Sequence, residues 1–421
     1  MIQTTKTASM KPLLLGPFSQ ILPFTGLPVK GALRDDQLPM IENGGILVQK
    51  GKIVKVDSFE KLYTKDVDFH HIQGKTVCLP GFVDSHTHIC YAGSRARDYA
   101  LRNSGGTYLE IAAAGGGIWD TVTQTRKADQ EALMDGILSR CLEHLDKGVT
   151  TLEVKSGYGL SVQEELKMLR AIKLARKKTP ASLVPTCLAA HMRPKDWADS
   201  REYLEVIVEE LLPIVRAEGL AHRVDAFVEQ SAFSPMEVLP YLQRAKQMGF
   251  DITVHADQFS PGGSRVAVEI GAISADHLEA SGEAEIALLA QSDTIATALP
   301  GASLGLGCGF APARKILDAG GALAIASDHN PGSAPMGDLL AQACILGTFE
   351  KLSNAEVLAG ITFRGAAALN LTDRGSLAPG NWADLAIFPT NDYREIPYHQ
   401  GRMGPREVWK KGVRVHKIDR I

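Results

Sequence analysis

The sequence lacks the features of membrane, secreted and nucleic-acid-binding proteins. It has no run of about 18 apolar residues, so we expect no membrane span. The 45 basic and 48 acidic side chains give a net charge of −3, too weak a field to hold nucleic acid or an anionic membrane. No Cys-x-x-Cys pair occurs, and Gly16 and Pro17 break the short apolar start. We therefore expect a cytoplasmic protein with reduced thiols and no secretory signal.

Aromatic residues are also scarce, at 6% of the chain, whereas 45% of the residues are hydrophobic and 22% are charged. This composition is ordinary for a globular protein and excludes a wholly disordered or fibrous one. The 40 glycines are somewhat more than usual and indicate many tight turns near functional loops. For the first 20 or so residues we expect an extended arm.

Short apolar runs alternate with longer amphipathic stretches through the middle of the chain. The longer stretches, such as 163–178, 197–218 and 234–248, carry apolar residues three and four apart, which predicts helices. Repeated strand–helix alternation predicts a closed parallel (β/α)8 barrel of the TIM type. An open doubly wound sheet would place a Gly-x-Gly-x-x-Gly turn after its first strand, where His-Thr-His stands instead. The eight predicted strands are 81–85, 150–154, 183–189, 224–228, 252–254, 272–275, 294–298 and 322–326.

Hairpin patterns occur near both ends of the chain. Residues 45–57 and 406–418 each place two short apolar runs around a turn of lysine and glycine. Because a lone two-stranded hairpin is marginal in water, we expect both ends to join in one small β-sandwich domain, with a further strand at 384–388. The predicted domains are 1–79 and 371–421, which together form the β-sandwich, and 80–370, which forms the barrel.

Polar, titratable side chains follow seven of the eight predicted strands, where barrel enzymes place their catalytic groups. His86 and His88 are two residues apart, so in an extended strand both imidazoles face one side and can bind one ion. His255 and Asp328 follow two other strands. Three imidazoles and a carboxylate suit Zn²⁺, although Fe²⁺ or Mn²⁺ also fits, and bound Zn²⁺ lowers the pKa of its water to about 7. The alternative for Asp328 is a helix N-cap.

Three further residues stand at strand ends. His191 and His277 are single histidines, and their positions favour a role in the site over a structural one. Glu229 also follows a predicted strand, but the sequence assigns it no role.

The segment from Leu79 to His88 resembles the first-strand motif of the amidohydrolase superfamily, and His255, His277 and Asp328 match its later landmarks in order. Within that superfamily the chain is similar to the imidazolonepropionase family over nearly its whole length after residue 35. The stretches that carry this closer resemblance are 92–95, 106–111, 115–118, 153–160 and 328–333.

The resemblance implies the hydrolysis of a small molecule, 4-imidazolone-5-propanoate, to N-formimino-L-glutamate in histidine degradation. It implies one divalent or iron cation per chain, Zn²⁺ or Fe, and such barrel hydrolases are often homodimers. The implied metal ligands are His86, His88, His255 and Asp328. The implied substrate-binding residues are Arg95, Tyr108, Tyr158, His191, Gln258, Asn330, Gly332 and Ser333.

We hypothesise that Arg95 holds the substrate carboxylate through two hydrogen bonds, the alternative being a surface pair with Asp98. Asp328 accepts the proton of the attacking water and passes it to the leaving nitrogen. His277 polarises the ring carbonyl or holds the attacking water, and His191 donates to the oxyanion. Gln258 is the fourth catalytic candidate. It occupies a position where Glu also occurs in the family, and an amide contributes hydrogen bonds but no base.

Two other functions stay open at this point. A different mononuclear amidohydrolase, such as an aminoazole, guanine or cytosine deaminase, would share the metal site but would not need Arg95 or the loop at 330–333 for a substrate tail. A non-catalytic barrel that serves as a scaffold would be expected to have lost metal ligands, yet all four are present in the sequence.

Overall fold

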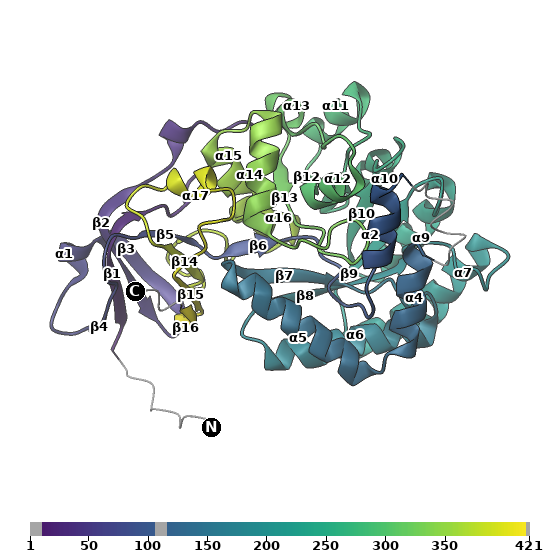
Figure 1. The fold of residues 1–421 in the computed structure, drawn as a ribbon, viewed down its shortest axis with the longest axis horizontal. Helices are drawn as coiled ribbons and strands as arrows, with labels where there is room; N and C mark the ends of the chain where they lie inside the picture. The colour runs from purple at the N-terminus through teal and green to yellow at the C-terminus, as the bar shows by residue number, and fades with distance from the viewer. Residues whose placement is uncertain (1–10, 106–115, 418–421) are drawn as a thin grey trace.

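The structure, a computed structural model, describes residues 11–105 and 116–417 and contains two sheets (Figure 1). Eight parallel strands form the barrel sheet in chain order, each hydrogen-bonded to the next. All eight predicted strands overlap these, so the predicted (β/α)8 barrel is confirmed. The strands are β6 (Phe82–Asp84), β7 (Val149–Lys155), β8 (Ser182–Ala190), β9 (Arg223–Val228), β10 (Asp251–Ala256), β11 (Ser274–His277), β12 (Ile295–Ala298) and β13 (Leu323–Ile325).

Helices cover the outside of the barrel, which explains why its strands are buried along most of their length. In Figure 1, α5 (Gln130–Asp146) and α6 (Val162–Lys178) lie against β7 and β8. The predicted helix at 234–248 is α9 (Pro235–Gln247). None of the helices in the described residues is long and apolar enough to cross a membrane.

The predicted helix at 197–218 is interrupted. The chain forms α7 (Ser200–Val206), a π-helical turn (Ile207–Leu211) and α8 (Leu212–Ala217). Pro213 has no N–H and therefore cannot make the hydrogen bond that continues an α-helix, which accounts for the wider turn before it.

The barrel closes at the C-terminal ends of its first and last strands. The N–H of Asp328 donates to the carbonyl of His86 (3.0 Å), and the N–H of His88 donates to the carbonyl of His329 (2.9 Å). Thr87 forms a parallel bridge with His329. The predicted metal ligands from the two ends of the barrel are therefore joined by backbone hydrogen bonds.

The second sheet contains β1 (Leu13–Ile21) among its inner strands, paired with neighbours on both sides. The expectation of an arm over the first 20 residues was therefore wrong for residues 13–20, because Leu14, Leu15 and Phe18 are buried in the sheet. Residues 1–10 lie outside the described residues. The other strands are β2 (Ile41–Gln49), β3 (Lys52–Ser58), β4 (Asp68–His71), β5 (Val77–Pro80), β14 (Leu385–Phe388), β15 (Glu407–Lys410) and β16 (Val413–Lys417).

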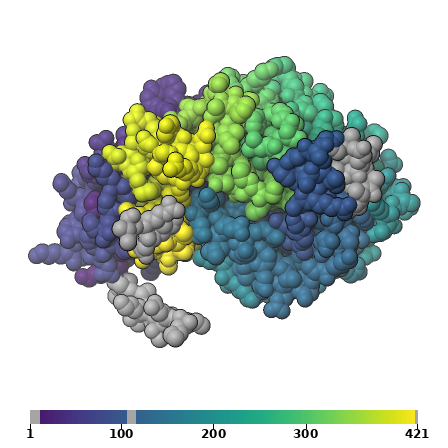
Figure 2. All heavy atoms as spheres, in the orientation of Figure 1, coloured from purple at the N-terminus to yellow at the C-terminus, as the bar shows by residue number. Residues whose placement is uncertain are grey.

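The two ends of the chain meet where β5 pairs antiparallel with β14. Strands from both ends of the chain contribute side chains to one core, which includes Leu15, Ile46, Ile387 and Trp409. Figure 2 shows the C-terminal segment, in yellow, between the purple N-terminal strands and the barrel. The expectation that both ends build one small β-domain is confirmed. The domain boundaries at 79/80 and 370/371 stay predictions.

Candidate active site

Four side chains from three parts of the barrel meet at the C-terminal ends of the strands. Nε2 of His88 lies 3.2 Å from Nε2 of His86 and 3.2 Å from Nε2 of His255. Oδ1 of Asp328 lies 3.6 Å from Nε2 of His86 and 3.4 Å from Nε2 of His88. All four residues are buried. The structure thus brings the four predicted metal ligands together.

The three imidazoles are in the neutral form that metal binding requires. Burial lowers the pKa of His86 and of His88 well below its usual value and lowers the pKa of His255 to about 4. Nδ1 of His86 lies 2.7 Å from Oδ2 of Asp276, and Nδ1 of His255 lies 2.9 Å from Oδ2 of Asp225. A carboxylate beside Nδ1 places the ring proton there and leaves Nε2 with a free lone pair.

These donor atoms fit a divalent cation. Nε2 of His86 and Nε2 of His255 each carry a lone pair and lie 3.2 Å from Nε2 of His88, which offers a third lone pair when its own proton is on Nδ1. A cation between the three nitrogens is attracted to all of them. Zinc bonds to nitrogen at 2.0–2.1 Å place two ligands of a tetrahedral site about 3.4 Å apart. The four separations given above, those of His88 from His86 and His255 and those of Asp328 from His86 and His88, are 3.2 to 3.6 Å and agree with that spacing.

Asp328 does not cap a helix. The next helix after it, α14 (Leu339–Glu350), begins eleven positions later and is capped by the side chain of Asp338, so the N-cap alternative was wrong. Asp328 has a left-handed φ of +53°, and its Oδ1 faces the imidazoles of His86 and His88. Burial raises the pKa of its carboxyl to about 6.

The loop after Asp328 is organised by one amide side chain. Nδ2 of Asn330 donates to Oδ2 of Asp328 (2.8 Å) and to Oγ of Ser333 (3.0 Å). Oδ1 of Asn330 accepts the N–H groups of Gly332 and Ser333, both at 2.8 Å. Asn330 therefore orients the carboxylate of Asp328 and sets the shape of the loop that sequence similarity associates with the substrate.

His277 ends β11 beside the metal donors, and its ring centroid lies 5.4 Å from that of His255. Burial acts to lower its pKa, but the carboxylate of Glu279, whose Oε2 lies 3.4 Å from Nδ1, outweighs burial and raises the pKa above its usual value. Glu279 was not predicted from the sequence. His277 is therefore the histidine of the site that most readily carries a positive charge.

His191 has the opposite character. Its Nδ1 donates to the carbonyl of Gly157 (3.0 Å), and burial lowers its pKa to about 3. Its ring stacks on that of His88 at 5.2 Å and lies 5.4 Å from that of Tyr158. Because the single ring proton is on Nδ1, Nε2 is an acceptor. In this tautomer Nε2 offers no proton to an oxyanion, so the role of His191 as a donor stays a prediction.

Tyr158 is buried, and it lies on a loop whose backbone N–H groups donate to a carboxylate. Glu165, in the first turns of α6, is fully buried and accepts the N–H groups of Gly157 (3.0 Å), Gly159 (2.8 Å) and Leu160 (2.8 Å). The sequence analysis missed Glu165. A glutamate near the start of a helix that follows a glycine-rich turn is the signal that could have identified it.

Arg95 precedes α2 (Ala96–Asn103) and is mostly buried, with a side chain 12% exposed. Its Nε pairs with Asp98, and the carboxylate of Asp98 also accepts the N–H of Gly117 (2.8 Å). Its Nη1 faces Gly332, where an added β-carbon would lie only 2.9 Å away. Arg95 thus makes the predicted pair with Asp98 and also reaches the loop beside Asp328.

Glu229, which had no assigned role, fixes the loop that carries Gln258. Its carboxylate accepts the N–H groups of Phe259 (3.0 Å) and Ser260 (3.1 Å), as well as the hydroxyl of Ser260. Gln258 is half-buried in this loop, directly after β10. Tyr108 lies outside the described residues.

Deeper in the barrel, three carboxylates surround the ammonium group of Lys155, which is fully buried. Nζ lies 2.7 Å from Oε2 of Glu153, 2.7 Å from Oδ2 of Asp225 and 4.0 Å from Oδ2 of Asp276. Burial acts to lower the pKa of Lys155, but the carboxylates raise it above its usual value. The signal for Asp225 in the sequence is a carboxylate between the apolar residues of β9 (Arg223–Val228).

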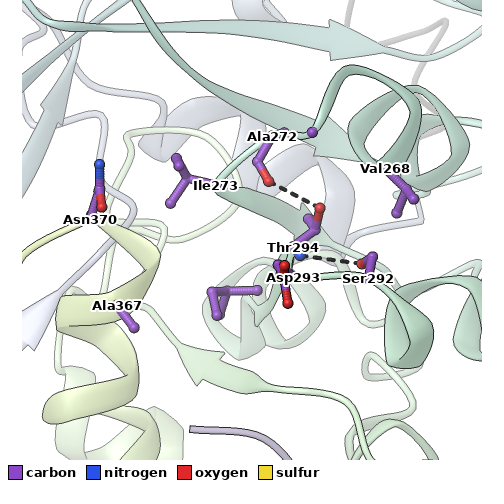
Figure 3. A pocket seen from close by; sticks show the side chains of 10 residues that line it. Val268, Ala272, Ile273, Ser292, Asp293, Thr294, Ala367 and Asn370 are labelled. Carbon is purple, nitrogen blue, oxygen red and sulfur yellow. Dashed lines mark hydrogen bonds between the residues drawn. The ribbon is translucent and has the colours of Figure 1, made fainter.

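A cavity of about 430 Å³ lies at the other end of the barrel (Figure 3). It is lined by Ala272 and Ile273 before β11 and by Ser292 and Thr294 before β12. These residues precede the two strands, whereas His277 is the last residue of β11 and the four predicted metal ligands lie at the C-terminal ends of their strands. The cavity is therefore separate from the candidate active site.

The model of the amidohydrolase family matches residues 77–415. An imidazolonepropionase of Symbiobacterium thermophilum is 41% identical over 414 residues, which cover 95% of this chain and 96% of the relative. One of Deinococcus deserti is 40% identical and covers 96% and 99%. One of Myxococcus xanthus is 45% identical and covers 79% and 80%.

Solved structures share the fold at low identity. A mutant of the atrazine chlorohydrolase of Arthrobacter aurescens, complexed with zinc and atraton, has a TM-score of 0.71 at 17% identity and covers 96% of this chain and 95% of its own. An adenosine deaminase of Xanthomonas campestris with bound zinc has a TM-score of 0.70 at 19% identity, covering 97% and 94%. The guanine deaminase of E. coli has a TM-score of 0.71 at 16% identity, covering 97% and 99%.

Proposed function

Since this chain belongs to the amidohydrolase family and, within it, to the imidazolonepropionases, we propose that the buried cluster at the barrel mouth is its catalytic metal centre. The protein hydrolyses a cyclic amide C–N bond of 4-imidazolone-5-propanoate and releases N-formimino-L-glutamate, in the degradation of histidine. The observation that carries the proposal is Nε2 of His88, which lies 3.2 Å from the Nε2 atoms of His86 and His255 and 3.4 Å from Oδ1 of Asp328.

The proposed ligands of one ion per chain, zinc or iron, are His86, His88, His255 and Asp328. When bound, a divalent ion supplies a Lewis acid that lowers the pKa of water to about 7 and polarises a carbonyl. The fold is shared with proteins whose structures contain zinc, and imidazole and carboxylate donors suit zinc and Fe²⁺ alike.

The propanoate tail of the substrate is held by Arg95, whose planar guanidinium can form two parallel hydrogen bonds to a carboxylate. Asp98 fixes the Nε side of Arg95 and leaves the Nη1 side facing Gly332. The loop of Asn330, Gly332 and Ser333 then lies against the same end of the substrate. Tyr108, Tyr158 and Gln258 complete the proposed contacts, with Gln258 acting through hydrogen bonds.

The proton is moved by Asp328. Its carboxylate, oriented by Asn330, is placed to accept a proton from the attacking water and return it to the leaving ring nitrogen. His277, with its raised pKa, is the donor toward the developing oxyanion. His191, as an acceptor at Nε2, receives an N–H of the substrate ring.

We also propose that the enzyme works in the cytoplasm and as a homodimer. All six cysteines are free thiols and five of them are buried, which suits a reducing compartment. The homodimer follows from the similarity to other barrel hydrolases, and light scattering of the purified protein tests it.

The function is tested by adding metal-quantified protein to 4-imidazolone-5-propanoate, guanine and cytosine and following ultraviolet absorbance. We expect turnover of the imidazolone alone. His88→Ala should lose both turnover and about one equivalent of bound metal, because it removes the central donor of the cluster. His222→Ala, at an exposed histidine, is the matched control and should retain both. Deamination of guanine or cytosine as the main activity would refute the proposal, as would full activity of His88→Ala.

A further inference from the structure

Lys155 and the two proposed histidine ligands share carboxylate oxygens. Oδ2 of Asp225 lies 2.7 Å from Nζ of Lys155 and 2.9 Å from Nδ1 of His255. Oδ2 of Asp276 lies 4.0 Å from the same Nζ and 2.7 Å from Nδ1 of His86. In each carboxylate, the oxygen that faces the imidazole is therefore the one that faces the ammonium.

These groups come from five strands or strand ends that the chain brings together only in the folded barrel. Lys155 ends β7, Asp225 lies in β9, Asp276 lies in β11, and His86 and His255 belong to the first and fifth strand positions. The ammonium is fully buried, so water does not substitute for it. One cation thus connects the supports of two rings that would otherwise be oriented independently.

We propose that Lys155 is a positioning residue for metal binding, which fixes through Asp225 and Asp276 the ring orientation of both His86 and His255. The proposal rests on the metal site proposed above. An ordinary buried ion pair affects only the stability of the fold. Lys155, in contrast, also contributes to the affinity for the metal.

The physical reason is the concentration of negative charge around Lys155. Glu153, Asp225 and Asp276 are all fully or almost fully buried, and without the ammonium they repel one another at low effective dielectric. The carboxylate side chains then rotate away from one another. Rotation of Asp225 or Asp276 moves its oxygen away from Nδ1 of a ligand ring, and the loss of such a partner typically costs about 10- to 100-fold in metal affinity.

The test compares Lys155→Met with Lys410→Met. Lys410 is also a buried lysine, 2.6 Å from one carboxylate, that of Asp384, but it lies in β15 of the terminal sheet. Each full-length protein is stripped of metal and titrated with Zn²⁺ against a chromophoric chelator. We expect Lys155→Met to bind Zn²⁺ about 10- to 100-fold more weakly than the unaltered protein, and Lys410→Met to stay within about twofold.

Cobalt gives a second readout that a purely structural role would not change. The visible absorption of Co²⁺ depends on the geometry of its ligands, so Lys155→Met should alter the spectrum whereas Lys410→Met should not. Asp276→Asn should weaken Zn²⁺ binding as well. In the double variant with Lys155→Met, the fold loss of Zn²⁺ affinity should be smaller than the product of the two single losses, because both changes act on the ring of His86.

The outcomes separate this inference from the proposed function. If the unaltered protein does not bind one equivalent of Zn²⁺, the proposed metal site itself is refuted. If it does, unchanged affinity and an unchanged Co²⁺ spectrum in Lys155→Met would overturn the positioning role alone, as would fully multiplicative losses in the double variant. Lys155→Gln replaces Lys155→Met if the latter does not fold. Failure of both to fold, with Lys410→Met folded, would assign Lys155 to core stability and overturn the inference.

Discussion

Replacing Glu165 by alanine removes the carboxylate that holds the loop of Tyr158. Three buried N–H groups, those of Gly157, Gly159 and Leu160, would lose their acceptor, and the fully buried position leaves no room for bulk water to replace it. An orphaned buried donor costs about 1–3 kcal/mol, so for three donors we expect Glu165→Ala to lower the free energy of unfolding by at least about 3 kcal/mol.

Glu165→Gln gives a graded comparison. Oε1 of Glu165 accepts two of the three N–H groups and Oε2 accepts the third. An amide that places its oxygen at the Oε1 position keeps two hydrogen bonds and loses one, so the expected loss is about 1–2 kcal/mol. Glu164→Ala, at the neighbouring half-buried position, is the matched control and should change stability by about 1 kcal/mol or less.

Urea unfolding measures these free energies, and steady-state kinetics on 4-imidazolone-5-propanoate measures the effect on the site. We expect kcat/KM of Glu165→Ala to fall at least about tenfold, because Tyr158 is no longer fixed beside His191. Equal stability of Glu165→Ala and Glu164→Ala would refute the claim that the carboxylate holds the loop. Unchanged kcat/KM in a destabilised Glu165→Ala would refute its link to the site.

Two further changes probe the substrate contact and the acid sensitivity of the fold. Arg95→Ala should raise KM for the propanoate substrate about tenfold or more, with a smaller effect on an analogue that lacks the carboxylate; equal losses on both compounds would contradict the assigned contact. The pKa of His144 is lowered by burial to about 3, so as pH falls below about 6.5 the unfolded state takes up the proton first and stability is lost. Urea unfolding should therefore show His144→Gln losing about 2 kcal/mol less than the unaltered protein between pH 7 and pH 5, and equal losses would contradict the assignment.

The fold could be predicted largely from local patterns. Parallel strands buried on both faces appear as short apolar runs, and the helices between them show an apolar period of three and four, so all eight strands were found. The pattern failed at residues 13–20, where Gly16 and Pro17 hide a strand whose partners lie more than 20 residues away. It also failed at Pro213, because apolar spacing does not report a missing N–H.

The site could be predicted where titratable side chains stand at the ends of the barrel strands. His86, His88, His255 and Asp328 were chosen as metal ligands from residue type and position, and the structure brings them within 3.2 to 3.6 Å along the contacts described. That they bind the metal stays a prediction. The supporting carboxylates were missed or left without a role, because a buried aspartate or glutamate looks the same in a sequence as an exposed one.

The sequence by itself determined the order of strands and helices and the residue types available at each strand end, because these depend on neighbours along the chain. Only the tertiary structure decided the charge and tautomer of the histidines. His191 became an acceptor through the carbonyl of Gly157, and His277 gained its positive character from Glu279. Such properties depend on burial and on the group beside Nδ1, and across the barrel those groups are set by folding rather than by sequence distance.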